Sequence, residues 1–212
     1  MLRKVLASLV ILCLVAASLQ AAPIPLPNAA YTSSTTLINI SGIPNSTGVN
    51  SITDGVMTVG FSSTLDKRQV PSGNWSTWSS PPFSETATPH VLFSTGSSLT
   101  LTLSKAASIF GFELEPNNFG NFLITTTFSN GDVIAQLVNG NAGARLFASG
   151  GGSLITSVNI QADSGAAGFA IAQIRYSLAT VPEPASILAW GFVAGGCCVA
   201  TRLRRRSKPV AA

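Results

Sequence analysis

Apolar side chains recur at every second position through most of residues 22–180, and this pattern restricts the fold more than any other feature. In residues 99–103 leucines alternate with threonines, and in residues 110–115 phenylalanine and leucine alternate with glycine and glutamate. Because successive side chains of a β-strand point to opposite faces, the alternation indicates strands with one buried face. We predict strands at residues 31–40, 57–61, 99–103, 110–115, 121–129, 132–138, 154–160 and 169–177.

Turn residues separate these predicted strands at short intervals. Asn130-Gly131 lies between two of them and predicts a tight hairpin, because both residue types tolerate a positive φ. Asn139-Gly140 ends the following strand in the same way. Short strands with one apolar face each need a second sheet to cover that face. The sequence therefore predicts an all-β fold, an antiparallel β-sandwich of the jelly-roll-like kind.

The first 21 residues have the pattern of a secretory signal peptide. Arg3 and Lys4 form a basic start, an apolar run follows from Val5 to Leu19, and Ala21 offers a small residue for cleavage. We therefore expect a signal peptide at 1–21, a β-sandwich ectodomain at 22–180 and a separate C-terminal segment at 181–208. Export would follow the general secretory route.

Composition excludes several functions for the predicted ectodomain. The three cysteines, Cys13, Cys197 and Cys198, lie in the apolar ends, so no disulfide, thiolate nucleophile or cysteine metal site is expected between them. His90 is the only histidine, which excludes multi-histidine metal sites, and no cofactor is predicted. Residues 22–180 hold five basic and seven acidic residues, a net charge of −2, so no nucleic-acid partner is expected.

The C-terminal segment has three parts in a fixed order. Val181-Pro182-Glu183-Pro184 comes first, and its prolines favour an extended backbone. An uncharged apolar run then covers 185–201, a length at the short end of what spans a bilayer. The basic tail 202–208 follows, with Arg202, Arg204, Arg205 and Arg206 as stop-transfer residues that hold this end in the cytoplasm.

These three parts together resemble the PEP-CTERM sorting signal of bacteria that have exosortases and make exopolysaccharide. The resemblance covers about a sixth of the chain. It implies that an exosortase recognises Val181, Pro182, Glu183 and Pro184 as substrate residues and cleaves near them. The precursor would be anchored transiently in the inner membrane, and the product would reach the cell surface or the extracellular matrix, with exopolysaccharide as a further partner. The alternative is a permanent single-pass membrane protein in a cell without an exosortase.

Residues 62–90 interrupt the strand pattern with a loop rich in proline. It holds Trp75 and Trp78, and exposed tryptophan rings can stack on the flat faces of sugars. We interpret these two residues as a candidate glycan contact. The alternative is that both rings cover the end of the sandwich and fix the loop.

Two glutamates are the remaining candidates for chemistry. Glu113 and Glu115 share one face of a predicted strand, so a surface glycan hydrolase with paired carboxylates is one hypothesis. The other hypothesis places both on a solvated outer face. No Gly-x-Ser-x-Gly motif accompanies His90, and no catalytic residue is predicted. The favoured function is a structural or adhesive surface protein without enzymatic activity.

Overall fold

The computed structural model describes residues 22–179, and strands make up most of this part of the chain. Two short helices interrupt them, α2 (Ala29–Ser34) and the 3-10 turn η1 (Ser164–Ala166). The strands are β1 (Ala22–Ile24), β2 (Thr36–Leu37), β3 (Gly48–Thr53), β4 (Thr58–Gln69), β5 (His90–Ser94), β6 (Ser98–Pro116), β7 (Asn121–Phe128), β8 (Val133–Asn139), β9 (Arg145–Ala162) and β10 (Phe169–Leu178).

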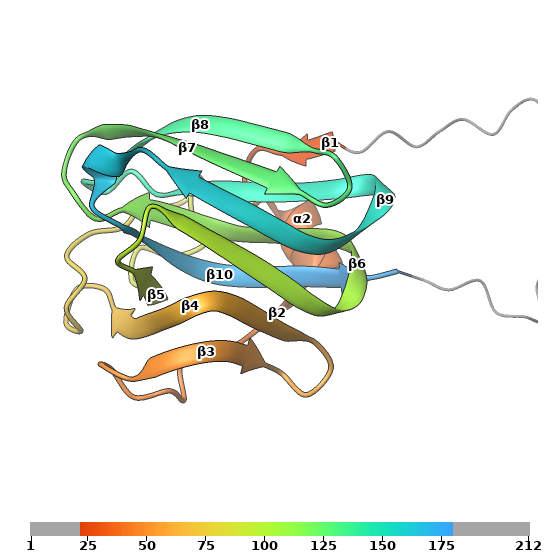
Figure 1. The fold of residues 1–212 in the computed structure, drawn as a ribbon, viewed down its shortest axis with the longest axis horizontal. Coiled ribbons are helices and arrows are strands. Elements are labelled where there is room, and N and C mark those ends of the chain that lie inside the picture. The colour runs from red at the N-terminus through yellow and green to blue at the C-terminus, as the bar shows by residue number, and fades with distance from the viewer. Residues whose placement is uncertain (1–21, 180–212) are drawn as a thin grey trace, which may run out of the picture. The chain divides into compact units, whose positions relative to one another are not determined.

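The long strands β6 and β9 run through both layers of the fold. The first part of β6 pairs with β4 and β9, whereas its last part pairs with β10 and again with β9, always antiparallel. The register of β6 against β9 shifts between Thr102 and Ala107, and such irregularities bend a strand. Leu101 and Phe112, from the two parts of β6, belong to one buried cluster, so the sheet folds over a common core. The predicted all-β antiparallel sandwich is confirmed, and Figure 1 shows β3 and β8 at opposite edges.

The core comes from the apolar faces that the alternation predicts. Leu99, Leu101, Phe110, Phe112 and Leu114 are fully buried. The ring of Phe112 stacks on that of Phe147 with 6.2 Å between centroids, which joins β6 to β9 inside the core.

A third layer covers one part of the sheet, where the last residues of β6 pair with β9 and β10. It lies on the face that points away from the core. Residues Gly111–Pro116 are buried on both faces of that strand. Tyr31 of α2 packs against Leu146 and Ala148 of β9 on this side. The proline-rich segment 70–89, which we call the covering loop, packs Trp75 and Trp78 against β5 and β10.

The strand predicted at 31–40 is wrong. Residues 29–34 form α2, and only Thr36–Leu37 are extended as a strand. Asn28 caps the helix, because its Oδ1 accepts a hydrogen bond of 2.9 Å from the backbone N–H of Tyr31. Hydroxyls of the Ser/Thr run bond back to carbonyls of the same turn, as between Thr35 Oγ1 and Tyr31 O at 2.7 Å. These local bonds compete with a sheet ladder despite the β-branched residues.

Two further boundaries differ from the prediction. Strand β4 continues to Gln69, so the interruption predicted at 62–90 is the shorter covering loop. In the β7–β8 hairpin only Gly131 has a positive φ, of 97°. The carbonyl of Phe128 accepts one hydrogen bond from the N–H of Gly131, and the N–H of Phe128 donates to the carbonyl of Asp132. The connection is therefore a three-residue turn that ends in a left-handed glycine. The predicted hairpin is present, with a turn of a different type.

Candidate functional site

Both tryptophans of the covering loop are buried, with 6% of Trp75 and 4% of Trp78 exposed. Each indole N–H donates to a glutamate on β6: Trp75 Nε1 to Glu115 Oε2 at 3.0 Å, and Trp78 Nε1 to Glu113 Oε2 at 2.8 Å. The hypothesis that these rings form an exposed glycan contact is therefore wrong. A buried indole with its N–H paired to a strand fixes the loop on the sheet.

The carboxylates of Glu113 and Glu115 also accept hydrogen bonds from other residues of the covering loop and from the turn before β9. Glu113 Oε1 accepts the backbone N–H of Glu85 at 2.6 Å, and Glu115 Oε1 accepts the hydroxyl of Thr77 at 3.2 Å. The backbone N–H of Gly143 also donates to Glu115, at 3.2 Å. Both glutamates are fully buried. The alternation correctly puts them opposite the apolar core, but the predicted solvated face is wrong because the covering loop lies over it.

An ion pair closes the opposite end of the covering loop. Arg175 on β10 donates from Nε to Glu85 Oε1 and from Nη2 to Glu85 Oε2, both at 2.7 Å. Its Nη1 donates to the carbonyls of Thr32 and Thr35 at the end of α2. A paired Arg–carboxylate geometry of this kind is directional and strong. It joins α2, the covering loop and β10.

Burial changes the acidity of the two glutamates. Desolvation raises the pKa of Glu113 to about 7, and the hydrogen bonds from Trp78 and Glu85 oppose this rise. Among charged neighbours, Glu85 raises this pKa and Arg175 lowers it. Burial also raises the pKa of Glu115. Near neutral pH, a substantial fraction of the folded protein therefore carries Glu113 as the neutral carboxylic acid.

The hydrolase hypothesis requires that a glycan contacts Glu113 or Glu115. In this structure neither carboxylate reaches solvent, and each accepts two or more hydrogen bonds from the layers above. Attack on a glycosidic bond would need the covering loop to leave the sheet. Within residues 22–179, no group of three His, Cys, Asp or Glu side chains could hold a metal ion.

A small polar cleft opens beside the outer edge of Trp75. Its volume is about 60 Å³, and the ring of Phe119 at its rim is 66% exposed. Asn74 has a positive φ of 65° at one wall, and its side-chain amide makes no hydrogen bond within the described residues. The other lining residues are Ser76, Thr77, Asn117 and Gly140. We call this the Phe119 cleft; the sequence signal for it is a single aromatic residue within the polar turn 117–120.

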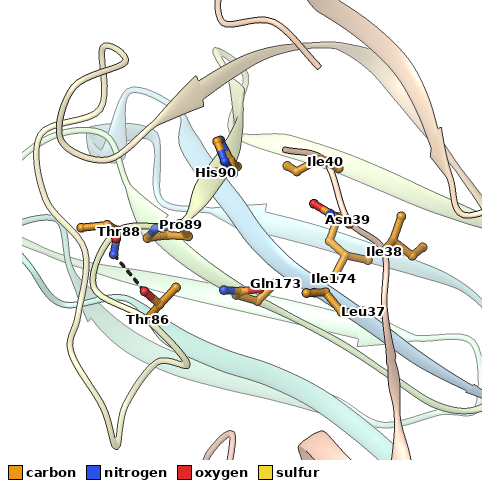
Figure 2. Close-up of a pocket in the computed structure, with 10 residues that line it drawn as sticks. All are labelled: Leu37, Ile38, Asn39, Ile40, Thr86, Thr88, Pro89, His90, Gln173 and Ile174. Carbon is orange, nitrogen blue, oxygen red and sulfur yellow. Dashed lines mark hydrogen bonds between the residues drawn. The ribbon is translucent and has the colours of Figure 1, made fainter. Parts of the chain in front are cut away.

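A second, larger pocket lies at the start of β5. Its volume is about 180 Å³, and Figure 2 shows its lining drawn from three segments that are far apart in the sequence. These are residues 37–40 after α2, residues 86–90 at the end of the covering loop and start of β5, and residues 173–174 of β10. His90, for which the sequence predicts no catalytic role, lines this pocket at the start of β5.

The sorting residues lie outside the described residues. These are Val181, Pro182, Glu183, Pro184, Arg202, Arg204, Arg205 and Arg206, together with the apolar run 185–201 and the signal peptide 1–21. Within residues 22–179, no helix has the length and apolar character needed to cross a membrane.

Comparisons with known proteins give distant similarities only. No protein-family model and no curated protein matches the chain. The enzymatically active domain of bacteriophage CBA120 tailspike protein 4 aligns at 20% identity over 69% of this chain, with a TM-score of 0.27. The chain spans 20% of the length of that solved tailspike chain. The family 11 carbohydrate-binding module of the cellulase Lic26A-Cel5E of Clostridium thermocellum aligns at 10% identity over 70% of this chain and 97% of the module, with a TM-score of 0.28. With TM-scores this low, neither similarity assigns a family or a function.

Proposed function

We propose that this chain is an exported surface protein whose β-sandwich binds extracellular glycan at the Phe119 cleft. The observation that supports it is the exposed ring of Phe119, next to the unpaired amide of Asn74. A sugar ring has an apolar C–H face and a rim of hydroxyls. An aromatic ring beside free polar groups offers one partner for each.

The role is structural or adhesive in this proposal. Glu113 and Glu115, the two carboxylates of the hydrolase hypothesis, accept hydrogen bonds from the covering loop, so neither contacts a substrate in this proposal. In this proposal the aromatic residue that contacts the glycan is Phe119, in place of the two buried tryptophans.

We expect Phe119→Ala to weaken binding to polysaccharide extracted from the producing cells by about tenfold, because loss of one stacked ring costs about 1–3 kcal/mol. Affinity electrophoresis of the detergent-solubilised full chain would measure it. The matched control is Phe83→Ala, which removes an exposed ring that lies against Arg145, 4.4 Å from its guanidinium, and does not line the cleft. Equal retention of wild type and Phe119→Ala would refute the cleft as the glycan site.

The second part of the proposal concerns sorting. The order of Pro182-Glu183-Pro184, the apolar run 185–201 and the arginines at 202–206 supports processing by an exosortase. The inner membrane would hold the precursor, and the product would be released to the surface or the matrix.

We expect mass spectrometry of the mature protein from its host to find a C-terminus close to Pro184 and no peptide from 202–212. Glu183→Ala should leave the precursor uncleaved in the inner membrane, because the recognised carboxylate is gone. Asp163→Asn changes an exposed carboxylate outside the motif and should leave cleavage intact. Surface protein that still carries residues 202–212 would instead support the permanent single-pass alternative.

A further inference from the structure

A buried lysine contacts the histidine that lines the 180 Å³ pocket. Lys67 on β4 is only 2% exposed, and its Nζ donates to Asn45 Oδ1 at 2.6 Å. The same Nζ is 2.9 Å from His90 Nδ1. Both partners, the amide of Asn45 and the ring of His90, carry no negative charge. No carboxylate of residues 22–179 forms an ion pair with Lys67, because the two pairs described there are Arg68–Asp66 and Arg175–Glu85.

A buried cation without a counter-charge is costly, so this arrangement has a physical cost that an anion would reduce. Burial lowers the pKa of Lys67, in the direction expected for an ammonium that lacks a counter-charge. Asn45 and His90 solvate the ammonium without neutralising it. The missing element at this position is a negative charge.

The contact with Lys67 fixes the tautomer of His90. An ammonium can only donate, so Nδ1 of His90 must accept and the ring proton must be on Nε2. Burial and the charge of Lys67 lower the pKa of His90, which keeps the ring neutral. Within the described residues no acceptor takes the Nε2 proton, so the ring offers a donor polarised by the lysine behind it.

The other side of the pocket is built around an irregularity in β10. The register of β10 shifts between Ala172 and Arg175, and Gln173 adopts a left-handed φ of 49°. Such a backbone is strained in a residue other than glycine. Gln173 lines the pocket, its amide has no partner within residues 22–179, and Figure 2 shows it between Thr86 and Leu37.

The volume of the pocket and the residues that line it restrict the class of ligand that it can bind. The pocket volume of about 180 Å³ is well above what one water molecule needs and suits a single sugar ring. Ile38, Ile40 and Ile174 give it apolar walls, while Asn39 and Thr88 add polar groups. A bare inorganic anion would leave these apolar walls unused.

We propose that this pocket binds a single hexuronate. Its carboxylate accepts a hydrogen bond from Nε2–H of His90, and the positive charge of Lys67 behind that ring balances the negative charge of the carboxylate. The amide of Gln173 and the hydroxyl of Thr88 hold the sugar hydroxyls. The source is either the free sugar acid or the end of an acidic polysaccharide. This site shares no lining residue with the Phe119 cleft and goes beyond the glycan contact proposed there.

The test is calorimetric titration of the detergent-solubilised full chain with D-glucuronate, D-glucose and acetate. We expect glucuronate to bind at least tenfold more tightly than either of the others, because glucose lacks the charge and acetate lacks the ring. An oligosaccharide with a terminal glucuronate that binds more tightly than the free acid identifies the polysaccharide source; weaker binding identifies the free sugar acid. Equal affinity for glucuronate and glucose, or for glucuronate and acetate, would overturn the proposal.

Two variants assign the binding to this pocket. Lys67→Met keeps the bulk and removes the charge, so glucuronate should bind at least tenfold more weakly, while exposed Lys105→Met changes nothing. Gln173→Gly removes the amide, and glycine adopts the positive φ at this position without strain. This variant therefore tests the pocket even if Lys67→Met fails to fold. It should also weaken glucuronate binding several-fold. Phe119→Ala should bind glucuronate like wild type, which separates this proposal from the glycan cleft. Unchanged glucuronate binding in a folded Lys67→Met or Gln173→Gly variant would overturn it.

Discussion

Trp78→Ala should lower the free energy of unfolding by about 4 kcal/mol, one of the largest effects of any single substitution in the covering loop. Removing a buried aromatic side chain leaves a cavity, and such changes cost about 3–5 kcal/mol. The ring is 4% exposed, and the change also removes a donor to the buried carboxylate of Glu113. Urea unfolding followed by circular dichroism measures the loss.

Trp78→Phe separates the two contributions. The ring largely remains, whereas the 2.8 Å hydrogen bond to Glu113 Oε2 is lost. Bonds to charged groups contribute about 1.5–3 kcal/mol, so we expect a loss of about 2 kcal/mol. Exposed Phe119→Ala is the control and should change stability by less than about 0.5 kcal/mol. A Trp78→Ala protein as stable as wild type would mean that the ring faces solvent, and would restore the tryptophans as a glycan contact.

The sequence predicts the strands well where the alternation is local. Residues 99–103 and 110–115 lie in β6, and their apolar members enter the core as predicted. Alternation depends only on neighbouring residues along one strand, so it survives without knowledge of the rest of the fold. Residues 31–40 show its limit, because Asn28 and the hydroxyls of the run satisfy the backbone in a helical turn.

The candidate site is predicted less well because its contacts are distant in sequence. Trp75 and Glu115 are 40 residues apart, and nothing in the local pattern of either residue shows that the loop covers the strand. Proline and tryptophan mark the covering loop as unusual, but the same residues suit an exposed platform or a buried anchor. Polar positions on a strand do not report whether a further layer lies above them.

Lys67 gives a signal that the sequence does contain. It shares the inward parity of Leu65 on β4, so a charged residue stands where the alternation requires an apolar one. An inward lysine in a strand has either a partner or a ligand. The partner His90 is 23 residues away, and only the fold brings it within hydrogen-bond distance.

Glu113 should make the protein more stable in mild acid than in mild alkali. Its pKa is about 7 in the folded chain against an ordinary value of 4.5, so the folded state holds its proton more strongly. Stability from the neutral carboxyl is fully present below about pH 4.5 and is lost as pH rises through about 7. The full change amounts to about 3 kcal/mol, since one pKa unit corresponds to about 1.4 kcal/mol. The raised pKa of Glu115 acts in the same direction.

Three other groups act in the opposite direction, so the comparison has to be made within one variant pair. His90, Asp54 and Lys67 have lowered pKa values, and all three therefore favour the folded state more as pH rises through their own ranges. Glu113→Gln keeps the shape and removes the titration, so the difference between wild type and this variant isolates Glu113. Urea unfolding at constant ionic strength from about pH 5 to pH 8.5 should show that difference shift by about 3 kcal/mol in favour of the variant. Asp163→Asn, at an exposed turn, should leave the wild-type slope intact. If wild type and Glu113→Gln have parallel pH profiles, Glu113 is ionised in the folded protein throughout this range, and the desolvation imposed by the covering loop is smaller than its contacts indicate.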